Sequence, residues 1–237
     1  MPLPPLKVDW TLIDTIHLDM DGTLLDRHFD DHFWLEHVPR RYAEKNGLTE
    51  SAAREKLYRM FRSQEQTLNW TDLDYWTAQL GLDIPVLKEE VNHLIGVHPF
   101  VIEFLLFLRQ HGKKIYLVTN AHGKTLNLKL RRTKIGGYFD GIISAHDLGL
   151  PKEDPVFWEK LQQKVPYDPE RSMLGEDSET NLETARQFGI RYLIHVGRFS
   201  STATPAQSEN FHTIHYFSEL IPRDGGMCVE IQPTRGL

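Results

Sequence analysis

Short apolar segments recur along this 237-residue chain, and stretches with helical periodicity separate them. Most of these segments are continuously apolar, which is typical of strands that are buried on both faces of a parallel sheet. Helices between consecutive strands supply the crossovers that parallel strands require. The alternation therefore predicts an α/β fold with an open, doubly wound, Rossmann-like parallel sheet. The predicted strands are 15–19, 115–119, 141–144, 172–175, 191–196 and 213–216, and the predicted helices are 100–110, 125–132, 155–164 and 181–188.

One long stretch lacks this alternation and contains no convincing strand. Its helical patterns fall at 39–45, 51–66 and 72–80, with Gly47 and Gly81 as helix stops. We therefore expect residues 1–28 and 97–223 to form the α/β core, and residues 29–96 to form an inserted, all-helical cap over the carboxyl edge of the sheet. Residues 224–237 contain a Gly-Gly pair and show little periodicity, so we expect a poorly ordered tail.

Composition narrows the class of protein. The chain has 27 Lys and Arg against 33 Asp and Glu, a net charge of −6, which disfavours binding to a nucleic-acid backbone. Its most apolar stretch, 101–108, is far shorter than the roughly 20 residues that span a bilayer. The single cysteine, Cys228, is typical of a reducing cytoplasm, and the first seven residues lack the pattern of a secretory signal. We expect a cytoplasmic monomer or weak dimer that binds neither nucleic acid nor membrane.

The strongest chemical signal follows the first predicted strand. Asp19 and Asp21 lie two residues apart where this strand ends, so both carboxylates can face one crevice. Two adjacent anions are costly unless a cation neutralises them, and Mg²⁺ prefers carboxylates combined with a substrate phosphate. The glycine that follows, Gly22, allows a sharp turn close to a ligand. The pattern predicts an Mg²⁺ site, and a pair of solvated acids at a strand end is the alternative.

Three later segments could deliver residues to the same place. An apolar strand ends in Thr119-Asn120, Lys152 follows Pro151, and Glu176-Asp177 follows another strand. Taken alone, each has a structural explanation: a β-branched strand residue, a solvated lysine, and acids at a helix N-terminus. Together with Asp19-Met20-Asp21-Gly22-Thr23, their order and spacing over residues 12–200 resemble the four motifs of the haloacid dehalogenase superfamily. Ligands of open α/β sheets bind at the carboxyl ends of the strands, where all four motifs would meet.

This resemblance implies a mechanism for phosphoryl transfer. Asp19 would be the nucleophile that forms an aspartyl-phosphate. Asp21 would protonate the leaving oxygen and then activate the water that hydrolyses the intermediate. Thr119, the backbone N–H of Asn120, and Lys152 would bind the phosphoryl oxygens.

The resemblance also implies a set of Mg²⁺ ligands. The metal would be bound by the Asp19 carboxylate, the Asp21 backbone carbonyl and Asp177. Many members of the superfamily carry two aspartates in the fourth motif, whereas this chain has Glu176 before Asp177. Glu176 would therefore bind the metal directly or through water, and its role stays open.

The similarity extends into the predicted cap. The segments Phe29-Asp30, Phe33-Trp34, Thr67-Leu68-Asn69-Trp70, Leu73-Asp74-Tyr75-Trp76, Thr119-Asn120-Ala121-His122 and Pro151-Lys152-Glu153-Asp154 are similar to those of the GMP/IMP nucleotidases of proteobacteria. This likeness implies a 5′-nucleotidase that acts on purine nucleoside monophosphates. The aromatic residues of the cap could stack on a purine, although a helical cap also needs aromatic residues in its core.

Other functions remain open at this point. One is a phosphatase for a small metabolite, such as phosphoglycolate or a sugar phosphate. A second is a phosphotransferase that resembles β-phosphoglucomutase, and a third is a catalytically silent nucleotide-binding or scaffold protein. The presence of all the motif residues disfavours the silent protein.

Overall fold

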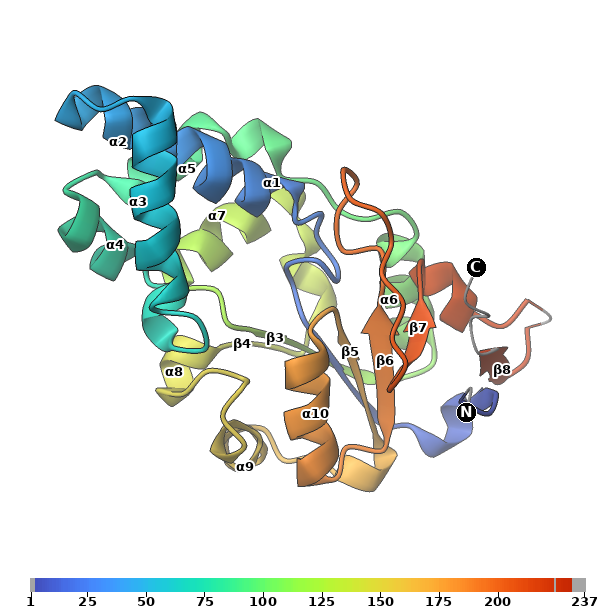
Figure 1. Cartoon of the computed structure of the whole chain (residues 1–237). Coiled ribbons are helices and arrows are strands. Elements are labelled where there is room, and N and C mark those ends of the chain that lie inside the picture. Colours follow the sequence, from blue (N-terminus) through green and yellow to red (C-terminus); the bar gives the residue numbers. More distant parts are fainter. Residues whose placement is uncertain (1–2, 224, 232–237) are drawn as a thin grey trace.

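The computed structural model describes residues 3–223 and 225–231 (Figure 1). Its main sheet has six strands in the order β4-β3-β2-β5-β6-β7, and every neighbouring pair is parallel. These strands are β2 Thr15–Leu18, β3 Lys114–Thr119, β4 Gly141–Ser144, β5 Ser172–Glu176, β6 Tyr192–Val196 and β7 His212–Ile214. The sheet confirms the predicted doubly wound α/β fold, and the strand boundaries lie within about two residues of those expected.

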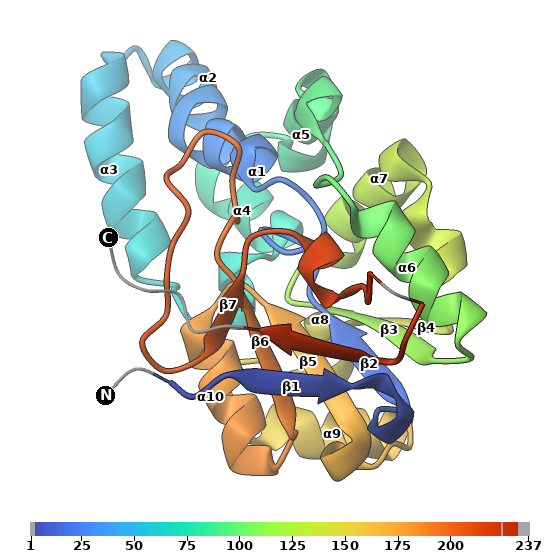
Figure 2. The same cartoon turned by 90° about the vertical axis from the view of Figure 1, so that its right-hand side faces the viewer.

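Consecutive residues of the central strands point to opposite faces of the sheet, and both faces are buried. Leu117 and Met173 belong to the hydrophobic cluster that contains Phe104, whereas Val118 and Leu174 belong to a second cluster. Helices α6 and α7 contribute to the first cluster, and helices α9 and α10 contribute to the second. Figure 2 shows the two pairs of helices on different sides of the sheet. Burial on both faces explains why these strands read as continuous apolar runs.

The helices of the core follow the strands in the predicted places. They are α6 Val101–Gln110, α7 Gly123–Thr133, α8 Ala145–Leu148, α9 Val156–Lys164 and α10 Glu179–Phe188, with single 3-10 turns at Trp10–Leu12, Ile135–Tyr138, Pro169–Arg171 and Phe217–Leu220. The four-residue α8 was not predicted, because it is shorter than the window over which helical periodicity can be recognised. Among the described residues, no helix is long and apolar enough to cross a membrane.

The sequence between β2 and β3 forms a group of helices. In space this group lies beyond one end of the sheet (Figure 1). They are α1 His28–His32, a π-helix at Phe33–His37, α2 Val38–Asn46, α3 Glu50–Arg62, α4 Leu73–Leu80 and α5 Ile84–Glu90, with 3-10 turns at Leu68–Trp70 and Asn92–Leu94. We call these elements the cap. Gly47 and Gly81 end α2 and α4 in the left-handed conformation that favours glycine. The short α1, the π-helix and α5 were not predicted.

The segment near the C-terminus differs from the expected poorly ordered tail. Strand β8, Cys228–Ile231, pairs antiparallel with β1, Leu6–Asp9 (Figure 2). Ile231 is buried, and the Trp10 amide donates to the Met227 carbonyl at 2.7 Å. A ladder only four residues long leaves a weak sequence signal, which explains the error. Residues 224 and 232–237 lie outside the described residues.

Candidate active site

Asp19 and Asp21 lie beside the position in the sheet where the order of the strands reverses. Strand β2 is flanked by β3 on one side and β5 on the other, and ligands of such sheets bind at this point. Asp19 directly follows β2, and its amide donates to the Gly175 carbonyl at 3.0 Å. The turn after Asp21 brings Gly22 against the fourth motif, where an added Cβ would lie 2.4 Å from Asp177 Oδ2. Gly22 has a φ of +85°, so both its conformation and its surroundings require glycine.

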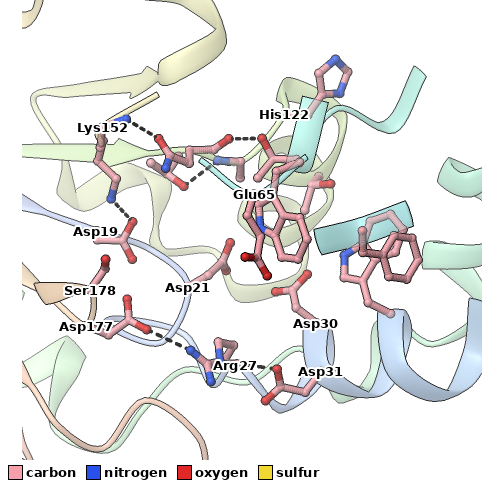
Figure 3. A pocket seen from close by; sticks show the side chains of 18 of the residues that line it. Asp19, Asp21, Arg27, Asp30, Asp31, Glu65, His122, Lys152, Asp177 and Ser178 are labelled. Carbon is pink, nitrogen blue, oxygen red and sulfur yellow. Dashed lines mark hydrogen bonds and ion pairs between the residues drawn. The ribbon is translucent and has the colours of Figure 1, made fainter. Parts of the chain in front are cut away.

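Lys152 is a buried residue and not a solvated surface charge. Its side chain is only 1% exposed, and Nζ lies 2.5 Å from Asp19 Oδ1 (Figure 3). Nζ also lies 2.6 Å from Glu176 Oε2. Nζ also donates to the Val118 carbonyl at 3.3 Å. Burial alone would lower the pKa of Lys152, but the carboxylates of Asp19 and Glu176 raise it, so the lysine stays protonated. Lys152 thus joins the first and fourth motifs with a permanent positive charge.

The residues at the end of β3 shape the loop that contains Lys152. The Asn120 side chain accepts a hydrogen bond from the Lys152 amide at 2.9 Å and donates to Glu153 at 2.8 Å. Thr119 is 1% exposed, and its hydroxyl accepts from the Ala121 amide at 3.0 Å. Both residues line the same cavity as Asp19. The Asn120 side chain therefore orients the loop that contains Lys152 and Glu153. The sequence analysis predicted a role for the backbone N–H of Asn120 and none for its side chain.

Three carboxylates of this site are close enough to hold a metal ion. One oxygen each of Asp19, Glu176 and Asp177 lies within 4.8 Å of the other two. Lys152 contributes one positive charge against three negative ones, so the group keeps an excess of negative charge. Arg27 reduces this excess only in part, because it is 40% exposed and lies 3.4 Å from Asp177. Oxygen donors with uncompensated charge fit a hard divalent cation such as Mg²⁺.

The pKa values reflect the same excess of negative charge. Burial, followed by the neighbouring Glu176 carboxylate, raises the pKa of Asp19 to about 6. Burial also raises the pKa of Asp177 well above its ordinary value, with Glu176 and Asp19 adding to the rise. Ionising these acids together is unfavourable in the protein alone, because their negative charges repel one another. A bound cation would relieve this repulsion.

Asp21 has a partner that the sequence analysis missed. Lys129 Nζ lies 2.5 Å from Asp21 Oδ1 and also contacts Asp30 of the cap. Burial raises the pKa of Asp21 to about 6, although Lys129 opposes the rise. One sequence signal indicated that Lys129 is buried. It lies four residues after Thr125 and three after Leu126, which places it on the buried side of its helix.

The cap also contacts the core beside the loop that follows β3. The Thr71 hydroxyl donates to the Asn120 carbonyl at 2.6 Å and lies 2.9 Å from His146 Nε2. Together with the Asp30–Lys129 contact, this fixes the cap at two places around the acids. The acids therefore lie under the cap and not on an open sheet edge.

A cavity of about 470 Å³ lies between the cap and the core, within the usual range for small-molecule sites. Its core side carries the charged residues described above (Figure 3). Its cap side combines five aromatic residues with charged ones, among them Arg62, Glu65 and Lys88. Among the aromatic lining residues, Phe61 and Trp76 are packed edge to face and are 7% and 1% exposed. By contrast, Tyr58 is 54% exposed and Trp70 is 41% exposed. The first pair belongs to the core of the cap, and the second pair is available to a ligand.

A haloacid dehalogenase-like hydrolase model matches residues 13–189, and the chain belongs to this family. GMP/IMP nucleotidase YrfG of Escherichia coli is 38% identical over 217 residues, which cover 92% of this chain and 98% of that protein. A phosphoglycolate phosphatase of Pseudomonas putida is 26% identical over 187 residues, covering 76% and 68%. The crystal structure of a HAD phosphatase from Thermococcus onnurineus has a TM-score of 0.74 at 23% identity, covers 88% of this chain and 96% of its own, and shares the fold.

These comparisons confirm the family that the motifs predicted. They also confirm an enzyme of the phosphatase class, because relatives along most of the chain carry phosphatase and nucleotidase names. Family membership is consistent with the four motifs meeting at one cavity. It does not assign a role to any one residue, and the roles below are therefore proposals.

Proposed function

We propose that this protein is an Mg²⁺-dependent 5′-nucleotidase of the cytoplasm that hydrolyses purine nucleoside monophosphates, GMP and IMP above all. One cavity that joins an acid cluster and a buried lysine to exposed aromatic side chains carries this proposal. The acids and Lys152 suit a divalent cation and a phosphomonoester, and the exposed rings of Tyr58 and Trp70 suit a flat heterocycle. The nucleotidase similar to this chain acts, by its name, on GMP and IMP, which supports the same substrate class.

In the first half of the reaction, an oxygen of Asp19 attacks phosphorus and forms an aspartyl-phosphate. The bond between phosphorus and the nucleoside 5′-oxygen breaks, and Asp21 gives its proton to that oxygen. A pKa of about 6 supports this role, because a measurable fraction of Asp21 keeps its proton near neutral pH. Lys152 and the Thr119 hydroxyl hold the phosphoryl oxygens while charge moves between them.

In the second half, water attacks the phosphorus of the aspartyl-phosphate. Asp21 is now ionised, so it accepts the proton of that water, and inorganic phosphate leaves with Asp19 restored as a carboxylate. The raised pKa of Asp21 places both proton transfers close to physiological pH. Each step conserves charge and needs no further reactant.

Asp19, Asp177 and the Asp21 backbone carbonyl would hold Mg²⁺, which would offset the repulsion between the Asp19 carboxylate and the substrate phosphate. We assign Glu176 to holding Lys152 in place beside the metal. Two contacts support this assignment: Oε2 accepts from Lys152 at 2.6 Å, and Oε1 accepts from the Ser178 amide at 3.2 Å.

The exposed aromatic residues of the cap, Trp70 and Tyr58, would bind the base. Trp70 and Tyr58 are large apolar side chains that stay exposed although they line a cavity, and a stacked base would cover them. Stacking of a base on an aromatic side chain contributes about 1–3 kcal/mol. A sugar phosphate or phosphoglycolate has no flat ring to make this contact. The aromatic surface therefore favours a nucleotide over the small-metabolite alternatives.

A phosphate-release panel tests the proposed substrate. We expect kcat/KM to be highest for GMP and IMP, compared with pyrimidine monophosphates, phosphoglycolate, glucose 1-phosphate and glucose 6-phosphate. Trp70→Ala should raise KM for GMP about tenfold, a little over 1 kcal/mol of lost stacking, and leave KM for p-nitrophenyl phosphate within about threefold. Preference for a sugar phosphate, or isomerisation without phosphate release, would overturn the proposal in favour of a phosphatase or mutase of other metabolites.

A further inference from the structure

Four charged side chains form a connected group beneath the cap. Lys88 Nζ lies 2.9 Å from Asp30 Oδ1, Asp30 Oδ2 contacts Lys129, and Lys129 Nζ lies 2.5 Å from Asp21 Oδ1. Both lysines are 2% exposed at the side chain. Asp30 and Lys88 come from the cap, Lys129 comes from α7 of the core, and Asp21 follows β2. A chain of ion pairs therefore runs from the cap to the catalytic turn.

The two lysines of this group neutralise different carboxylates. Lys88 pairs with Asp30 and also lies over the rings of Phe29 and Phe33, at 4.8 and 4.6 Å from their centroids. Asp30 therefore has a cation of its own from the cap. Lys129 is the second cation, and the further anion that it neutralises is Asp21. Removing Lys129 would leave Asp30 paired with Lys88 but would leave Asp21 without a positive partner. The loss of Lys129 would therefore disturb the turn after β2 that contains Asp21.

The contact also orients the Asp21 carboxylate. Asp21 has acidic neighbours on two sides, Asp19 and Asp30, and both repel it. Lys129 contacts Oδ1, so in the proposed mechanism the proton transfer falls to the other oxygen, Oδ2. The Lys129 ammonium restrains the Asp21 carboxylate, because its side chain is only 2% exposed and a second carboxylate, Asp30, also holds it.

We infer that Lys129 is a positioning residue that orients Asp21 for proton transfer, and that Asp30 holds Lys129 in place from the cap. This inference rests on the proposed role of Asp21 as acid and base. It adds a residue that none of the four motifs contains. It also links the position of the cap to the chemistry, because Asp30 belongs to α1.

The test compares Lys129→Met with Lys88→Met, a matched loss of the other buried lysine. Misplacement of a catalytic group by about 1 Å can cost about 100-fold in rate. We expect Lys129→Met to lower kcat for GMP about 100-fold with KM within about threefold, and Lys88→Met to keep kcat within about fivefold. Equal kcat for wild-type protein and Lys129→Met, or an equal loss in both lysine variants, would overturn the inference.

The leaving group separates positioning from a general loss of structure. Nitrophenolate departs without a proton, whereas a nucleoside alkoxide needs one from Asp21. With p-nitrophenyl phosphate, Lys129→Met should therefore release about one equivalent of nitrophenolate quickly and then turn over slowly, because water attack on the aspartyl-phosphate still needs Asp21. A variant that is merely partly unfolded would instead lose the rapid phase and the slow phase in the same proportion, and this result would contradict the positioning role.

A double variant covers the case in which Lys129→Met folds poorly. Lys129→Met leaves two carboxylates against the single charge of Lys88, whereas Lys129→Met/Asp30→Asn leaves only Asp21, whose charge also acts on Lys88. The thermal midpoint of the double variant should therefore rise above that of Lys129→Met while its kcat stays low. Recovery of kcat together with the midpoint would show a structural role only. Assays on p-nitrophenyl phosphate also test the role of Lys129 separately from the nucleotide substrate. If the protein fails to hydrolyse GMP, the proposed substrate is refuted, but wild-type protein and Lys129→Met can still be compared on p-nitrophenyl phosphate.

Discussion

Replacing Asp19, the proposed nucleophile, by asparagine should make the metal-free protein more stable while abolishing its activity. In the folded protein, burial and then the Glu176 carboxylate raise the pKa of Asp19 to about 6, compared with an ordinary value of 3.8. Above pH 3.8 the unfolded chain ionises this group more readily than the folded protein does, so the ionised aspartate favours unfolding. Asparagine is neutral in both states and removes this penalty.

The size of the effect follows from the pKa values. Each pKa unit corresponds to about 1.4 kcal/mol, so a rise from 3.8 to about 6 corresponds to about 3 kcal/mol in the free energy of unfolding. The full gain should be present above pH 6. At pH 4.5 the unfolded chain is only partly ionised, and the gain should fall to about 1 kcal/mol. Asp19 is 5% exposed, so solvent screening does not reduce this figure appreciably.

Urea unfolding in the presence of EDTA measures this effect. Wild-type protein and Asp19→Asn would be compared at pH 7.5 and pH 4.5, with circular dichroism as the signal and the m-value checked for a change in the unfolded state. A more stable variant at pH 7.5, with a smaller gain at pH 4.5, supports the reasoning. A variant that is less stable at pH 7.5, or a gain that is the same at both pH values, would refute it. Phosphatase activity near the native level in this variant would refute the nucleophile assignment.

Two further substitutions test local features of the structure. Gly22→Ala should lower the free energy of unfolding by about 1–2 kcal/mol, because φ is +85° there, and should raise the Mg²⁺ concentration for half-maximal activity, because the new methyl group displaces Asp177; unchanged stability and unchanged Mg²⁺ response would contradict this. Burial lowers the pKa of His17 to about 3, so the folded protein loses stability as pH falls below 6.5. His17→Phe should therefore lose about 2 kcal/mol less than wild-type protein between pH 7.5 and pH 5, and an equal loss in urea titrations would be the contrary result.

The sheet and the four motifs could be predicted from the sequence because each depends on short segments. A strand buried on both faces must be apolar throughout, and this signal lies within five or six residues. Asp19 and Asp177 directly follow such strands and Thr119 ends one, so the strands alone bring these three residues to one edge. Lys152 lies beyond α8, and the order of the motifs pointed to it. The order of the motifs then placed them in a family.

The parts that were missed depend on contacts between distant residues. Lys129 lies 108 positions after Asp21, and only the packing of α7 under the cap shows that their side chains meet. The same holds for the aromatic residues of the cap: the sequence did not separate Trp76, which is buried, from Trp70, which is exposed in the cavity. Strand β8 was missed because it is only four residues long and because its partner β1 lies at the other end of the chain.

Dependence of phosphate release on Mg²⁺ tests the central claim most directly, namely that acids from two strand ends surround one cation. Protein stripped of metal would be assayed with GMP while Mg²⁺ is restored stepwise, beside an Asp177→Asn variant. We predict no detectable turnover without metal, saturable recovery with Mg²⁺, and at least about a tenfold higher Mg²⁺ requirement in the variant. Full activity in the metal-stripped protein, or the same Mg²⁺ curve for both proteins, would contradict the account.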